Sequence, residues 1–182
     1  IEDIEGYRFE KYENLNENTK ICVSVPQVLK FGDHPSNFPF HCWKAFSYIL
    51  GALVKSGFIE NENEITLTLD SQYIEETLEY LKSEMSIYET KISQKDNNIK
   101  IYYKNFSLIF NSNFNMNSKK EILKFMLKTP IYMRQKFLEG FNKSENNINL
   151  DRDILRDVQL LGWVSGTPFY IKEDNGHFSL IK

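Results

Sequence analysis

Two apolar segments, each built around one glycine, most restrict the folds open to this 182-residue chain. The first is 48–57, with the sequence YILGALVKSG, and the second is 136–146, with the sequence KFLEGFNKSEN. Gly140 follows Gly51 after 89 positions, and the two segments align on these glycines. A glycine in an apolar helix allows a second backbone to approach closely. We therefore expect the two segments to form helices that pack against each other at Gly51 and Gly140.

A similar succession of predicted elements surrounds each segment, and such repetition indicates an internal duplication. Hydrophobic periodicity predicts, in each half, a helix, a strand, a second helix and two strands. The first half has a helix at 40–56, a strand at 64–69, a helix from 70 or 71 to 85, strands at 88–92 and 99–110, and a linker helix at 118–127. The second half has a helix at 131–143, a strand at 147–150, a helix within 151–162, and strands at 168–172 and 177–181.

Cap and turn residues set several of these boundaries. Short polar side chains accept hydrogen bonds from the free N–H groups of a first helical turn, so Asp70 or Ser71, Ser118 and Asp151 are predicted N-caps. Glu121 stands at the capping-box position relative to Ser118. Gly162 is predicted to end its helix, and the segments 95–98 and 173–176 have the composition of hairpin turns.

The composition favours a folded protein and argues against several classes of function. Hydrophobic residues make up 41% of the chain, which is enough for a sizeable core and unlike a disordered sequence. No stretch reaches the roughly 18 apolar residues of a membrane span, and the acidic N-terminus carries no targeting signal. We therefore expect an intracellular protein in a reducing compartment, without a zinc site, because the cysteines and histidines are scattered. They are Cys22, Cys42, His34, His41 and His177.

The two aligned segments resemble the LAGLIDADG signature of homing endonucleases, and the resemblance covers roughly residues 40–182. The matched positions are the first (Ile49 and Leu138), the third (Gly51 and Gly140) and the last (Gly57, replaced by Asn146 in the second copy). Segment 155–163 and the hairpin after it also resemble the endonuclease domains of inteins. The resemblance implies an α+β fold with two pseudo-symmetric αββαββ-type halves around a central helix pair. Its parts would be an N-terminal extension of unassigned role (1–39), a first repeat with linker helix (40–128) and a second repeat (129–182).

The resemblance also implies a function, the site-specific recognition and Mg²⁺-dependent hydrolysis of double-stranded DNA. The family's catalytic acid is the eighth motif residue, which is Ser56 in the first copy and Glu145 in the second. A pair of carboxylates can hold a metal ion that activates water, but a neutral serine is a poor ligand for a hard cation. We therefore predict Glu145 as the remaining catalytic and metal-binding residue, Ser56 as a degenerate position, and impaired cleavage. Glu60 and Glu62 follow closely, but either would need a distorted helix end to replace the missing acid.

Positive charge is concentrated in the middle of the chain. The net charge is -8 over residues 1–86 (7 basic, 15 acidic), +7 over 87–136 (10 and 3) and -2 over 137–182 (5 and 7), which sums to -3. Lysines that alternate along a strand share one face and can neutralise phosphates. In the family such strands form a saddle that lies in the DNA major groove. The predicted DNA-binding residues are Lys91, Lys95, Lys100 and Lys104.

Several interpretations remain open at this level. We expect a monomer with internal pseudo-twofold symmetry that binds double-stranded DNA, either freestanding or within an intein. The alternatives are a module that binds DNA or a host protein without cutting, and a structural intein insert. The simplest interpretations are that both glycine-containing helices are ordinary core helices and that the lysines only keep an exposed sheet face soluble.

Overall fold

The computed structural model describes residues 42–86, 89–104, 106, 115, 117–145, 150–174 and 177–181. The predicted N-terminal extension, Cys22, His34 and His41 lie outside the described residues, as does most of the strand predicted at 147–150. The helices are α1 (Cys42–Lys55), α2 (Ile74–Glu84), α4 (Lys119–Leu127), α5 (Ile131–Lys143) and α6 (Arg152–Trp163), with a 3₁₀ turn η2 (Ser71–Tyr73) before α2. The strands are β1 (Phe58–Asn61), β2 (Glu64–Thr68), β3 (Thr90–Lys95), β4 (Asn98–Tyr103), β5 (Tyr170–Asp174) and β6 (His177–Ile181).

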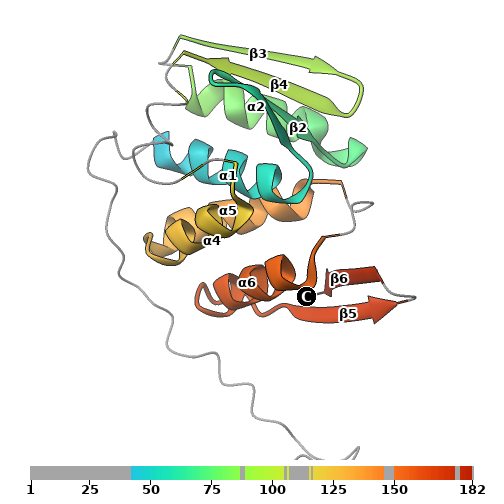
Figure 1. Cartoon of the computed structure of the whole chain (residues 1–182). Coiled ribbons are helices and arrows are strands. Elements are labelled where there is room, and N and C mark those ends of the chain that lie inside the picture. Colours follow the sequence, from blue (N-terminus) through green and yellow to red (C-terminus); the bar gives the residue numbers. More distant parts are fainter. Residues whose placement is uncertain are drawn as a thin grey trace, which may run out of the picture.

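These elements form the expected α+β architecture around a central helix pair. Strands β1 to β4 make one antiparallel sheet in the order β1-β2-β4-β3, and β5 pairs with β6 in a separate hairpin. Figure 1 shows the sheet with α2 at one end of the molecule, α1 and α5 in the middle, and α6 with the β5–β6 hairpin at the other end. In the described part of the chain, no helix is long and apolar enough to span a membrane.

The central pair confirms the prediction made from the two glycines. Helices α1 and α5 form the most extensive contact between any two elements of the fold. A Cβ atom added at Gly51 would lie 1.9 Å from the carbonyl oxygen of Phe137, and one added at Gly140 would lie 2.1 Å from that of Tyr48. The two backbones therefore touch at these positions, and no larger residue fits there without moving a helix.

Helix α1 is mostly apolar because nearly all of its side chains are buried. Aromatic side chains surround its N-terminal half, where Phe46 lies 6.0 Å from Phe106 and 6.1 Å from Tyr103 between ring centroids. Ala45, Ile49 and Ala52 are fully buried. A helix without a polar face belongs in the interior of a protein, and this helix lies between the four-stranded sheet and α5.

The described residues show the first half more completely than the second. The first half has the full αββαββ order, including β1, which the sequence analysis missed because it is a four-residue edge strand with mostly exposed residues. In the described residues of the second half, α5 is followed by α6 and one hairpin. The strand predicted at 99–110 ends at Tyr103, with Lys104 in a turn and Phe106 helical. Its last paired residues are Tyr102, opposite Glu64, and Tyr103, opposite Thr90.

Two of the predicted caps are confirmed. The Ser118 hydroxyl accepts a hydrogen bond from the Glu121 N–H at 3.3 Å, and the Asp151 carboxylate accepts one from the Asp153 N–H at 2.8 Å. The capping box is only half formed, because the Glu121 carboxylate accepts from the Asn115 N–H instead. Both caps satisfy N–H groups that a first helical turn leaves without partners.

Two boundary predictions are wrong. The side chain of Asp70 makes no cap hydrogen bond, because the 3₁₀ turn separates it from the first residue of α2. Gly162 does not end α6, which continues to Trp163. A Cβ at Gly162 would lie 2.4 Å from the Phe169 ring, so this glycine serves close packing. The glycine with a left-handed backbone is Gly166, at a φ of 80°.

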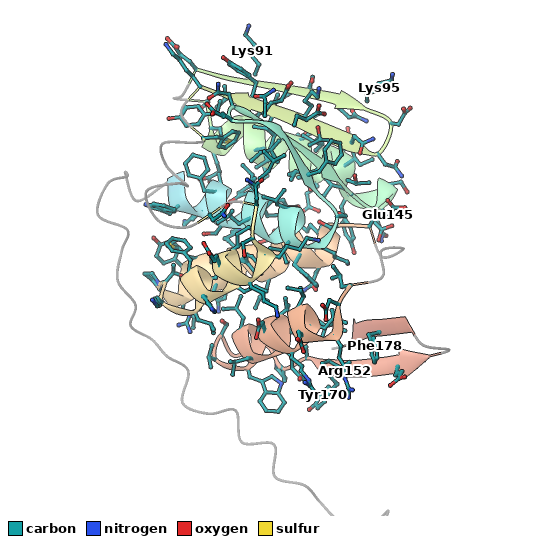
Figure 2. All side chains as sticks on the ribbon, in the orientation of Figure 1. Lys91, Lys95, Glu145, Arg152, Tyr170 and Phe178 are labelled. Atoms are coloured by element: carbon teal, nitrogen blue, oxygen red, sulfur yellow. The ribbon has the colours of Figure 1, made fainter. Side chains whose placement is uncertain are left out.

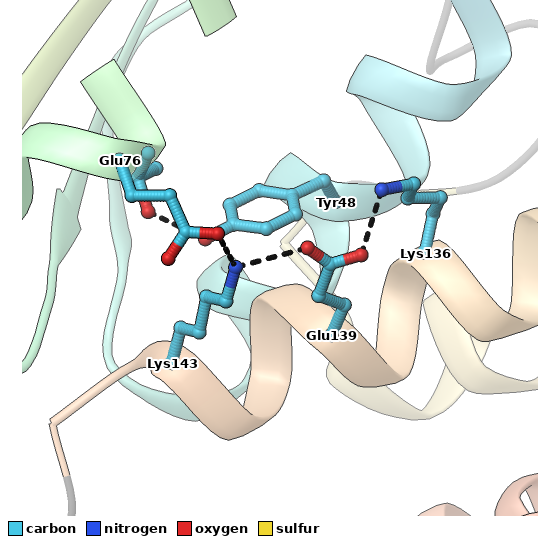
Figure 3. A network of polar contacts seen from close by, with 6 residues as sticks. Tyr48, Glu76, Lys136, Glu139 and Lys143 are labelled. Atoms are coloured by element: carbon cyan, nitrogen blue, oxygen red, sulfur yellow. Dashed lines mark hydrogen bonds and ion pairs between the residues drawn. The ribbon is translucent and has the colours of Figure 1, made fainter. Parts of the chain in front are cut away.

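A charged network fixes α5 against the first half of the chain (Figure 3). Glu139 pairs with Lys136 at 2.7 Å and with Lys143 at 3.0 Å, and Lys143 reaches Glu76 on α2 at 2.8 Å. Burial alone raises the pKa of Glu139, but the hydrogen bonds from Lys136 and Lys143 outweigh it and leave that pKa lowered. The Lys136 ammonium also lies 4.7 Å from the centroid of the Tyr80 ring, a cation–π contact that adds to the junction.

We expect Glu139→Gln to lower the free energy of unfolding by about 1 kcal/mol at pH 7, a value reduced by solvent screening of this partly exposed group. A carboxylate with a lowered folded pKa stabilises the fold above the unfolded pKa of about 4.3 and loses that contribution as the pH falls through the folded pKa. Urea unfolding at pH 7 and pH 3 measures the difference from wild type, which should be smaller at pH 3. An equal difference at both pH values contradicts the assignment.

Candidate functional site

The ends of α1 and α5 meet on a single backbone carbonyl. The Ser56 hydroxyl donates a hydrogen bond to the Thr68 carbonyl oxygen, and the Glu145 N–H donates to the same oxygen at 3.3 Å. Leu69 and Ser144 form an isolated antiparallel bridge beside them. The structure thus brings together the two eighth-position residues that lie far apart in sequence. We call residues Lys55, Ser56, Thr68, Ser144 and Glu145 the motif junction.

Lys55 is the member of this junction to which the sequence analysis gave no role. Its side chain is buried, and its Nζ donates a hydrogen bond to the Ser144 carbonyl oxygen at 2.9 Å. The ammonium lies 5.3 Å from the centroid of the Phe141 ring. Burial lowers its pKa to about 8, although the negative charge of Asp70 favours the protonated form. The lysine therefore remains mainly an ammonium ion at pH 7. A charged residue one position before the expected acid was the sequence signal that could have found it.

The donor set of the motif junction does not match a two-carboxylate metal site. Ser56 is buried, and its hydroxyl proton is directed to the Thr68 carbonyl oxygen. Glu145, labelled in Figure 2, is the one carboxylate-bearing residue of the motif junction, and the Lys55 ammonium donates to the carbonyl oxygen of its neighbour Ser144. Within the described ranges, no three His, Cys, Asp or Glu side chains are grouped so that they could hold a metal ion. Hard cations prefer several oxygen ligands with net negative charge, which this arrangement does not provide.

The predicted lysines of the sheet share one face, as the alternation required. In the register of β3 and β4, Lys91 lies opposite Tyr102, Ser93 opposite Lys100, and Lys95 opposite Asn98. Directly opposed residues point to the same side of a sheet. Lys91 and Lys95 are exposed on the edge strand β3, as Figure 2 shows. Lys104 is exposed in the turn after β4.

Lys100 differs from the other three lysines because it lies between two acids. Its Nζ is 3.3 Å from a Glu60 oxygen and 3.4 Å from a Glu64 oxygen. The hydrogen bond to Glu60 is the main reason that the pKa of Lys100 is raised. Glu60 also accepts a hydrogen bond from the Thr66 hydroxyl at 2.9 Å, so it belongs to the sheet and does not replace the acid missing at Ser56. In the described part of the chain, Lys91, Lys95 and Lys104 form no such ion pair.

The second half offers a less basic surface. Its hairpin exposes Tyr170 and Lys172, and Arg152 lies 5.4 Å from the centroid of the Phe178 ring. Figure 2 shows Arg152, Tyr170 and Phe178 at the end of the molecule away from Lys91 and Lys95. Arg156 lies 3.8 Å from Asp153, which offsets its charge. The exposed lysines of the first half therefore lie on two surfaces, the sheet (Lys91, Lys95) and α4 with its C-cap (Lys120, Lys124, Lys128).

Comparisons with known proteins gave three kinds of result. No family model matches the sequence. The chain is 30% identical over 122 residues to the transcription initiation factor IIB of Methanocaldococcus jannaschii, an alignment that covers 65% of this chain and 18% of that protein. The chain therefore spans less than a fifth of the curated relative that it matches.

Solved structures with a similar arrangement share little sequence with it. The crystal structure of I-DmoI in complex with DNA and Ca has a TM-score of 0.48 and 14% identity, and the similarity covers 77% of this chain and 82% of that chain. Mesophilic variants of the homing endonuclease I-DmoI give a TM-score of 0.49 and 13% identity, covering 77% and 88%. Full-length DUF199/WhiA from Thermatoga maritima gives 0.45 and 17%, covering 79% and 52%.

Proposed function

We propose that this chain is a LAGLIDADG-type domain that binds double-stranded DNA at a specific sequence and does not make double-strand breaks. One observation carries the proposal. Helices α1 and α5 touch at Gly51 and Gly140, and their ends place Ser56 and Glu145 on the same carbonyl oxygen. The motif alignment assigned these four residues to those roles from sequence alone. An ordinary pair of core helices requires neither the glycine contact nor the meeting of the two eighth-position residues.

Strand β3 of the β1–β4 sheet has two exposed lysines at a spacing that fits duplex DNA. Lys91 and Lys95 are four residues apart on β3, which corresponds to about 13 Å along a strand. The major groove of B-DNA is about 12 Å wide, so two such lysines match phosphates on opposite sides of the groove. Between them the face presents Ser93, Lys100 and Tyr102, side chains that can hydrogen-bond to base edges. Phosphate contacts supply affinity, and contacts with base edges supply specificity.

The lack of double-strand cleavage follows from the motif junction. Phosphodiester hydrolysis by this fold family uses one acid from each motif around a divalent ion, and here one acid is replaced by Ser56. The similarity to a small part of a much longer protein fits a domain carried inside a host protein, as the endonuclease domain of an intein is. In that setting the domain can persist after its nuclease activity has been lost.

The first test is selection of a binding site from a random DNA duplex library by the full chain, followed by fluorescence anisotropy on the selected duplex. We expect Lys91→Ala with Lys95→Ala to weaken binding and to lower the slope of log affinity against log salt by about 0.9 per lost phosphate contact. The matched control is Lys124→Ala with Lys128→Ala, which removes the same charge from exposed positions at α4.

The control variant should bind the selected duplex with wild-type affinity and salt slope. Two results contradict the proposal. One is the failure of the selection to enrich any sequence. The other is a salt slope that is unchanged when Lys91 and Lys95 are both removed.

A further inference from the structure

We propose that the Lys55 ammonium is a built-in cation of the motif junction, so that Glu145 takes no divalent ion unless both Lys55 and Ser56 are replaced. This inference deepens the proposed function and rests on it for the assignment of the eighth motif positions. The contacts at the junction carry it in three steps: the meeting of two helix ends, the cation that bridges them, and the use of the serine hydroxyl.

The first step is the meeting of two helix C-termini. α1 ends at Lys55 and α5 at Lys143, and their following residues meet at the Thr68 carbonyl. Each helix C-terminus carries partial negative charge from its unpaired carbonyl groups. Two acidic residues belong to this meeting point: Asp70, whose N–H donates to the Lys143 carbonyl oxygen at 3.1 Å, and Glu145, whose N–H donates to the Thr68 carbonyl oxygen. The region therefore has a surplus of negative charge, and a cation placed there is stabilised.

The second step is that this chain supplies the cation itself. The Lys55 side chain crosses from α1 to α5, and its Nζ donates to the Ser144 carbonyl oxygen at 2.9 Å. Ser144 is the motif counterpart of Lys55, since each residue is the fourth after its glycine. The Ser144 hydroxyl donates back to the Gly140 carbonyl at 2.8 Å. The seventh motif positions are thus joined to each other directly, with a cation on one and an acceptor on the other.

The third step concerns the residue next to the ammonium. The Ser56 hydroxyl donates to the Thr68 carbonyl oxygen, so its hydrogen bond joins the end of α1 to strand β2. If Ser56 alone became Asp, the new carboxylate would join a junction that already holds the Lys55 ammonium, and this positive charge would oppose the binding of a second cation. Metal binding requires that two carboxylates face a site without an internal positive charge. Restoring the missing acid is therefore insufficient while Lys55 remains.

The test is Mn²⁺ binding by full-length variants, measured with MnCl₂ by the loss of the electron paramagnetic resonance signal of the free ion. The proteins are wild type, Ser56→Asp, and Lys55→Met with Ser56→Asp, each with and without Glu145→Gln. Methionine keeps the length and apolar packing of the lysine stem. We expect the Lys55→Met, Ser56→Asp protein to bind one Mn²⁺ at least tenfold more tightly than wild type or Ser56→Asp. The added Glu145→Gln should abolish this gain.

Three results overturn the proposal: binding by Ser56→Asp as tight as by the double variant, no added binding by a folded double variant, or wild-type binding that Glu145→Gln removes. Circular dichroism establishes which variants fold. If the Lys55 variants do not, Ser56→Asp with and without Glu145→Gln remains decisive, because Lys55 is kept there and no Glu145-dependent binding is expected. DNA binding by wild type is measured separately by anisotropy, so failure of the proposed function is distinguishable from failure of this inference.

Discussion

Replacing Gly51 with alanine is expected to lower the free energy of unfolding by about 3 kcal/mol or more, the upper range for an added methyl group in a packed interior. Helix propensity alone predicts the opposite sign, since alanine is favoured over glycine in a helix by about 1 kcal/mol. The new methyl group would lie 1.9 Å from the Phe137 carbonyl oxygen and 2.8 Å from its carbon. Both atoms belong to the backbone of α5, so relief requires the two helices to move apart.

Urea denaturation followed by circular dichroism measures this change, and Gly140→Ala should behave in the same way because of its contact with Tyr48. The matched control is Gln135→Ala, at an exposed position of α5, which should alter stability by no more than about 0.5 kcal/mol. If Gly51→Ala is as stable as wild type, the two motif helices do not meet at these glycines, and the basis of the proposed function is lost.

The second large effect concerns cleavage. On the duplex selected for binding, we expect the unmodified chain to make no double-strand breaks with Mg²⁺ or Mn²⁺. Loss of one member of a coupled catalytic group lowers the rate by on the order of 10⁴-fold or more, and Ser56 lacks the charge of the acid it replaces. Ser56→Asp alone should remain inactive because the Lys55 ammonium stays at the junction. Lys55→Met with Ser56→Asp is the variant in which cleavage is expected to return.

The assay is the linearisation of a supercoiled plasmid that carries the selected duplex, followed over time on a gel. Glu145→Gln serves as the control for contaminating nucleases, because it removes the remaining motif acid and leaves the sheet face intact. Efficient linearisation by wild type, absent in Glu145→Gln, would refute the proposed loss of activity. Linearisation that persists in Glu145→Gln identifies a contaminant, and the assay is then repeated on repurified protein until the wild-type result stands alone.

The central part of the fold could be predicted from sequence because it depends on local patterns. The apolar residues around Gly51 and Gly140 predicted two packed helices, and Ser118 and Asp151 marked helix starts that the structure confirms. The hairpin of β5 and β6 was predicted from two alternating segments around a polar turn, and it forms with Asp174 opposite His177. Most of these features depend on residues close to one another in the chain. The helix pairing depends on a glycine inside a helix, which is disfavoured unless another backbone must approach closely.

Other features escaped prediction because they depend on distant neighbours. Strand β1 has mostly exposed residues and gains its structure from pairing with β2. Lys100 occupies an outward-facing position in the alternating strand, as a phosphate-binding lysine would. In the folded sheet, however, two carboxylates compensate its charge. Gly162 stands where a glycine commonly ends a helix, but here its lack of a side chain lets the Phe169 ring pack against α6. In each case the deciding partner belongs to another element, which no local pattern specifies.

The sequence by itself predicted that two glycine-containing helices would pair, and it has a serine at position 56 and a glutamate at the aligned position 145. Only the tertiary structure decided what occupies the place where those helices end. In the sequence, Lys55 resembles any charged residue at a helix end. Once α5 packs against α1, its Nζ donates to the carbonyl oxygen of Ser144, 89 positions away in the chain. Helix pairing depends on side-chain size, which is encoded residue by residue, whereas the burial and bonding of a charge depend on every element that folds around it.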